Sequence, residues 1–278
     1  IVANVKNERV VMVGLFENKP VLDEDQSQWL FDVYAWSLDN FDANVFFNHT
    51  VLVLPTNEFF PGRVDNQQGM AELIFDKVKS YAGISHWPTS VIDQSVCAIP
   101  NAPRLEIVGA LRAPNAVLKE PVPEEKRLQI PYNPQQVSNP EAMVASFAHT
   151  SAHFLGQMAK QPPPGGAEFW PHVTEVLATY LGFGLMFANS AYTFRGSCAS
   201  CYNPNANRDA YLSEQQSVYS LAIFAVLKGI DNKQVTPHLK GHLRGFYKKA
   251  VKEIRHRADD LAVLEKYKEL ASPALAHV

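Results

Sequence analysis

Two histidines four residues apart, His149 and His153, are the residues whose type and spacing most clearly suggest chemistry in this sequence. On an α-helix, side chains four positions apart project from the same face, about one turn from each other. Two imidazoles placed in this way can bind one zinc ion. The alternative is that each histidine is an ordinary core or surface residue that binds no metal.

The residue that follows His149 decides what such a zinc ion could do. In hydrolytic sites with the H-E-x-x-H pattern, a glutamate at this position takes a proton from the metal-bound water. Here the position holds Thr150. Because a threonine hydroxyl is not a usable base near neutral pH, the sequence predicts that hydrolysis by this route is impaired.

Four segments between residues 54 and 250 resemble, in order and spacing, a poorly characterised bacterial family of predicted zinc metallopeptidases. The resemblance implies a zincin-like fold, a possible zinc ion and a peptidase-like function. The segments are residues 54–63 (LPTNEFFPGR), 145–153 (ASFAHTSAH), 174–190 (TEVLATYLGFGLMFANS) and 211–225 (YLSEQQSVYSLAIFA).

The resemblance assigns roles to three residues. His149 and His153 match the two histidine ligands, and Glu175 matches an acid on the following helix. The family pattern has another acid one turn before Glu175, where this chain has Pro171; His172 beside it could donate a nitrogen instead. Glu175 could bind the metal directly, hold one of the histidines by a hydrogen bond, or be a solvated acid in the first turn of a helix. It is also the candidate replacement for the missing base.

Other residues have weaker claims on the site. Tyr211 and Tyr219 lie in the last family-like segment, where a hydroxyl near zinc could stabilise an oxyanion, although an aromatic on such a helix is more often a core residue. Glu58 and Arg63 could pair beside a cleft or hold a loop together. Cys198 and Cys201 form a single C-x-x-C pattern without a second pair, which favours a local disulfide or two free thiols over a zinc knuckle.

Composition limits the classes of function. The chain has 278 residues, 46% of them hydrophobic and 19% charged, which predicts a substantial folded core. A net charge of -3 argues against a nucleic-acid partner. No run approaches the roughly 18 apolar residues of a membrane span, and residues 1–6 lack the features of a secretory leader. A cytoplasmic location is expected, although the start at Ile1 allows for a segment removed earlier.

The apolar pattern predicts the elements. Residues 9–16, 51–54 and 104–111 are expected to be strands, whereas helical spacing is expected at 26–39 and at 67–82, with Gly83 as a stop. The five prolines between 113 and 134 favour an extended connection. Asn139 and Pro140 favour the start of a helix of about 20 residues. Further helices are expected at 171–191, at 213–228 with Gly229 as a stop, and at 237–270.

Together these patterns predict an α+β fold. Residues 1–112 form a mixed α/β part with a small sheet, 113–136 a proline-rich connection, and 137–278 a helical zincin-like part, with a cleft between the two parts; one continuous domain is the alternative. The predicted function is that of a zinc-metallopeptidase-like protein with impaired catalysis that acts by binding a peptide or protein. The alternatives are an active metal-dependent hydrolase that uses Glu175 or another acid as base, and a metal-free structural or interaction protein.

Overall fold

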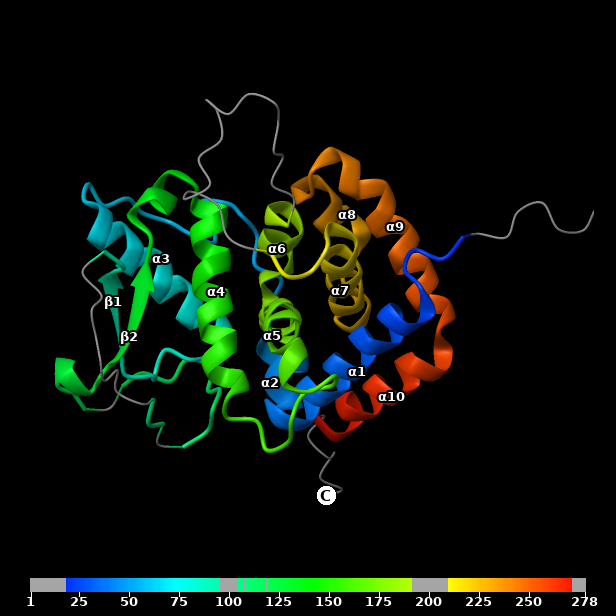
Figure 1. Ribbon diagram of the computed structural model, residues 1–278, viewed down its shortest axis with the longest axis horizontal. Helices are drawn as coiled ribbons and strands as arrows, with labels where there is room; N and C mark the ends of the chain where they lie inside the picture. Colours follow the sequence, from blue (N-terminus) through cyan, green and yellow to red (C-terminus); the bar gives the residue numbers. More distant parts are fainter. Residues whose placement is uncertain (1–18, 96–104, 108, 119, 192–209, 272–278) are drawn as a thin grey trace, which may run out of the picture.

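The structure is a computed structural model that describes residues 19–95, 105–107, 109–118, 120–191 and 210–271. These ranges form a mostly helical molecule with one small parallel sheet, drawn at the left of Figure 1, which agrees with the α+β class predicted from the sequence. In chain order the helices and strands are α1 (Glu24–Asn40), α2 (Ala43–His49), α3 (Gln67–Ala82), β1 (Thr89–Asp93), β2 (Leu128–Tyr132), α4 (Pro140–Gly156), α5 (Trp170–Ala178), α6 (Gly184–Ser190), α7 (Glu214–Leu227), α8 (Asn232–Val235), α9 (Gly241–His256) and α10 (Ala258–Ala271).

The sheet is not built from the runs that were predicted to be strands. β1 and β2 pair in parallel, with Val91 opposite Ile130. Residues 51–54 are extended but join no ladder, because the N–H of Val53 donates to the carbonyl oxygen of Gly182 at 2.9 Å. The described residues of 104–111 also form no strand. The strand predictions at 51–54 and in the described part of 104–111 are therefore wrong: the apolar side chains reflect packing against helices rather than pairing in a sheet.

The proline-rich segment, predicted to be an extended connection, contains the second strand of the sheet. Pro131 lies within β2, opposite Ile92, and its side chain is exposed. Proline cannot donate a hydrogen bond to a ladder, so it is tolerated where one side of a strand is unpaired. In a sheet of two strands both are edge strands, and this position is available.

Several helices begin and end where local signals predict. The side chain of Asn139 caps α4 by accepting from the N–H of Ala142, and Pro140 occupies the first turn. Gly83 ends α3 at φ +74° and Gly229 follows α7 at φ +65°, conformations that favour glycine. No helix in the described ranges combines the length and apolar composition needed to cross a membrane.

The helix predicted at 171–191 is interrupted. α5 continues into a π-helical turn, Thr179–Phe183, and then into α6. Gly182 within this turn has φ +104°, and a Cβ added there would collide with the carbonyl oxygen of Val51. The turn therefore opens where the extended segment 51–53 crosses it, and only glycine allows the two backbones to approach so closely.

One hydrophobic core joins the first part of the chain to the helical part. Helix α4 packs against α3 on one side and against α5 and α6 on the other (Figure 1). Across the first contact Phe75 meets Phe147 at 5.0 Å between ring centroids, and Phe46 from α2 stacks on Tyr180 at 4.5 Å. The core cluster extends from Leu22 to Leu264.

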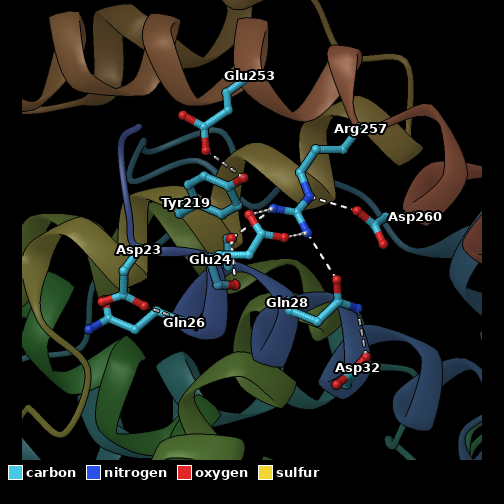
Figure 2. Close-up of polar contacts among 10 residues, drawn as sticks. Asp23, Glu24, Gln26, Gln28, Asp32, Tyr219, Glu253, Arg257 and Asp260 are labelled. Carbon is cyan, nitrogen blue, oxygen red and sulfur yellow. Dashed lines mark hydrogen bonds and ion pairs between the residues drawn. The ribbon is translucent and has the colours of Figure 1, made fainter. Parts of the chain in front are cut away.

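A polar network joins the start of the described chain to its last two helices (Figure 2). The guanidinium of Arg257, between α9 and α10, donates to both carboxylate oxygens of Glu24 and to Asp260, Ser27 and Gln28, at 2.6–2.9 Å. These bonds hold the first turns of α1 against the corner between α9 and α10.

Two predicted features lie outside the described residues. These are the strand at 9–16 and the C-x-x-C pattern of Cys198 and Cys201.

Candidate functional site around His149 and His153

Helix α4 carries both histidines of the motif, and α5 contributes the residues that surround them. His149, Thr150 and His153 are half-buried on α4, which packs against α5, and His153 contacts Trp170 of α5. The hydroxyl of Thr150 donates to the carbonyl oxygen of Ser146 at 3.1 Å, one turn back on the same helix. It therefore makes an ordinary intrahelical bond at the position where an H-E-x-x-H site has its base.

His153 is held by an indole. The Nε1–H of Trp170 donates to Nδ1 of His153 at 3.0 Å, and the two rings meet edge to face at 5.9 Å. Gly156, one turn further along α4, makes room for this indole: a Cβ at Gly156 would lie only 2.7 Å from it. The Trp170 ring therefore packs against α4 at Gly156, next to His153.

The indole bond also determines where the His153 proton lies. Because an indole N–H can only donate, Nδ1 must be the acceptor, and the proton of the neutral ring lies on Nε2. Nε2 is 2.9 Å from the side-chain amide of Gln157, whose oxygen accepts this proton when the amide is turned toward it. Burial lowers the pKa of His153 below its ordinary value of 6.5. The ring is neutral near pH 7, and both of its nitrogens already have partners.

Glu175 is a buried residue whose carboxylate binds the backbone of the segment before α7. Its side chain is fully buried, with one carboxylate oxygen accepting from the N–H of Tyr211 at 3.1 Å and the other from the N–H of Leu212 at 3.0 Å. The interpretation as a solvated acid in a first turn is therefore wrong, because the carboxylate is buried against the segment before α7. Two charge-assisted hydrogen bonds compensate the carboxylate for its loss of water.

Tyr211 brings two histidines of different helices together. Its ring is parallel to that of His149 at 6.0 Å and meets His172 edge to face at 6.1 Å. It is 46% exposed, so it is not a core residue. Tyr219 takes no part in this arrangement, since its hydroxyl donates to Glu253 at 3.0 Å.

In this arrangement His153 and Glu175 are bonded to other groups of the protein, which does not suit them as zinc ligands. No three His, Cys, Asp or Glu side chains in the described ranges converge as a metal-binding group. His153 offers no free nitrogen lone pair while Trp170 donates to Nδ1, and both carboxylate oxygens of Glu175 accept backbone N–H groups. His153 and Glu175 therefore have the hydrogen bonds of interior residues, whereas Nδ1 of His172 is buried without a hydrogen-bond partner among the described residues.

Trp170 is the residue that sequence reasoning missed. It precedes Pro171 at the start of α5, and neither its type nor its spacing indicated a role beside His153. A signal was available in Gly156, since a glycine in the last turn of a helix often marks a close approach. Of the other candidates, Glu58 and Arg63 form no ion pair with each other or with any other residue that the structure describes.

Comparison with protein-family models, with curated proteins and with solved structures finds no match to this chain.

Proposed function

We propose that this chain is a zinc-peptidase-like protein that does not hydrolyse peptides and acts by binding a peptide or protein. The observation that carries the proposal is the state of the two residues on which hydrolysis would depend. Thr150 replaces the base and bonds to Ser146, while Glu175, the candidate substitute, is enclosed and bonded to two backbone N–H groups. A threonine hydroxyl is not a usable base near neutral pH, and the enclosure of Glu175 supports the view that it does not replace the base.

A binding role is supported by aromatic side chains beside the motif. Phe169 and Tyr211 are 43% and 46% exposed, and both rings contact His172. Together with His149 these three residues form a surface that we call the aromatic patch. Exposed phenylalanine and tyrosine are enriched where proteins bind other chains, because their rigid rings bury much area at little cost in conformational entropy.

Zinc is not required by this proposal. For His153 to ligate a metal through Nε2, the proton must move to Nδ1, and Trp170 must then give up its hydrogen bond there. The proposal includes a fold in common with the zinc peptidases that this sequence resembles, in which α4 and α5 pack as in zincins. It does not include a bound metal.

The hydrolytic part of the proposal is tested with Thr150→Glu. Wild type and this variant are each incubated with zinc and a set of unstructured peptides, and cleavage is followed by mass spectrometry, with metal content measured on both and on His149→Ala/His153→Ala. We expect no cleavage by either protein, because restoring the glutamate does not free His153 or Glu175. Chelator-sensitive cleavage by the wild type that His149→Ala abolishes would establish an active hydrolase instead.

The binding part is tested on the same set of peptides immobilised on an array. Phe169→Ala/Tyr211→Ala should lose most of the peptide binding that the wild type shows. The matched control is Val263→Ala/Leu270→Ala, which removes two exposed apolar side chains from α10. Equal loss in both variants would mean that the aromatic patch has no special role.

A further inference from the structure

A cavity of about 480 Å³ lies between the first part of the chain and the helical part, away from the histidine motif. Its walls are the segment 55–63, one face of α3, the first turns of α4, and Met186 from α6. Neither His149 nor His153 lines it. A volume of this size is within the range of small-molecule sites, which makes the cavity a candidate binding site separate from the proposed peptidase-like site.

The cavity is mainly apolar. Its apolar walls come from four segments far apart in the sequence, and they include two methionines, whose flexible side chains adapt to different ligands. The principal apolar residues are Phe60, Met70, Leu73, Ile74, Val144 and Met186.

Glycine at position 62 shapes one wall of the cavity. Gly62 has φ +100°, and a Cβ there would touch Leu73 at 3.4 Å. The chain can therefore turn closely over α3 and bring Arg63 to the lining. This gives the family-like segment 54–63 a physical role, because seven of the nine residues from 55 to 63 line the cavity: Pro55, Thr56, Asn57, Phe60, Pro61, Gly62 and Arg63.

The charged side chains of the lining are two cations and one acid, an excess of one positive charge. Arg63 and Lys77 both line the cavity, and neither forms an ion pair with a residue that the structure describes. Glu141 is the acid of the lining, so the two cations outnumber it. The N-terminus of α4 also opens here, and the helix dipole adds partial positive charge. An anionic group is the complement of this excess of positive charge.

We propose that this cavity binds an apolar carboxylate, with the carboxylate near Arg63 and Lys77 and the apolar body between α3 and α4. Two sources supply this chemistry: the C-terminal residue of a peptide with a large aliphatic side chain, and a free fatty acid. The hydroxyl of Thr56, also in the lining, is shielded from solvent and has no hydrogen-bond partner among the described residues, so it is a further hydrogen-bonding group for a polar part of the ligand.

Binding is measured by isothermal titration with four probes that form two matched pairs. Decanoate is compared with decanol, and an acetylated hexapeptide that ends in leucine is compared with its C-terminal amide. At least one acid should bind, and its neutral partner should bind about tenfold more weakly or worse, because only the acid can pair with the cations. Binding by decanoate alone, by the peptide alone, or by both supports the proposal and identifies the source.

Two variants then locate the site. Arg63→Ala/Lys77→Ala should raise the Kd of the acid about tenfold or more, whereas Lys248→Ala/Lys249→Ala, two exposed cations on α9, should leave it unchanged. Met70→Trp should abolish binding by filling the cavity. Equal affinity for an acid and its neutral partner, no binding of any probe, or binding unchanged in both cavity variants would overturn the proposal. None of these results depends on the histidine motif, so failure here leaves the proposed function standing.

Discussion

At the scale of single residues, Glu175 shows how a carboxylate can match a motif and still do structural work. Removing a carboxylate from water costs several kcal/mol unless hydrogen bonds replace its hydration. Glu175 obtains these bonds from the backbone of Tyr211 and Leu212, immediately before Ser213, which caps α7. The acid therefore fixes where α7 begins relative to α5.

His153 should make the stability of the protein depend on pH below neutrality. Burial lowers its pKa in the folded state below 6.5, the value expected in the unfolded chain. As the pH falls through and below about 6.5, the unfolded chain takes up a proton that the folded protein excludes, so the free energy of unfolding decreases. Above this pH both states are neutral, and the contribution of His153 is fully present.

The test compares urea unfolding at about pH 7.5 and about pH 5.5. Wild type should lose stability on acidification, and His153→Gln should lose measurably less, because the half-buried imidazole is gone. His49→Gln, at an exposed position on α2, is the control and should behave as the wild type does. An identical pH dependence in wild type and His153→Gln would contradict the assignment.

At the scale of elements, close approaches between helices position the site. The π-turn in the α5 to α6 run admits segment 51–53, and Gly156 on α4 admits the ring of Trp170. Each contact brings a glycine against a segment that is distant in the sequence, and each is possible only because glycine has no Cβ. The site around His153 is therefore a product of how α4 and α5 meet, and not of α4 alone.

Gly156→Ala should destabilise the protein by about 1–3 kcal/mol, because the added Cβ would lie 2.7 Å from the indole of Trp170 and force it to shift. This loss should exceed the usual gain from replacing a helical glycine. Gly245→Ala on α9 is the matched control: nothing lies within 4 Å of its Cβ, and we expect a gain of up to about 1 kcal/mol. Both changes are measured by urea unfolding, and a gain at both positions would show that the contact is loose.

At the scale of the whole molecule, Arg257 joins the two ends of the described chain: its guanidinium bonds α1 to the corner between α9 and α10 (Figure 2). Arg257→Ala should lower the free energy of unfolding by about 2 kcal/mol, since it leaves Glu24, Asp260 and Ser27 without their common donor. Arg257→Lys should recover little, because an ammonium group cannot span these acceptors.

The exposed Arg255, two residues away, provides the control for this network. Arg255→Ala removes the same charge from α9 without breaking a side-chain bond in Figure 2, and its effect should stay within about 0.5 kcal/mol. Equal losses at 255 and 257 in urea unfolding would mean that charge alone, and not the geometry of the network, is responsible.

The local signals in the sequence determined much of the helical structure. Asn139 with Pro140 predicts the start of α4, Gly83 and Gly229 predict the stops of α3 and α7, and apolar spacing predicts α1. Such signals act within one or two turns, so they are complete in a short stretch of chain. The placement of both motif histidines on one helix followed from the same reasoning.

Only the tertiary structure decided the pairing of strands and the partners of the motif. An apolar run such as 51–54 suits a strand and a packed extended segment equally, and which one forms depends on what lies beside it. Glu175 meets backbone N–H groups 36 and 37 residues away, and His153 meets an indole 17 residues away. Contacts over such separations depend on how the helices pack, so they cannot be predicted from the spacing of residues along the chain.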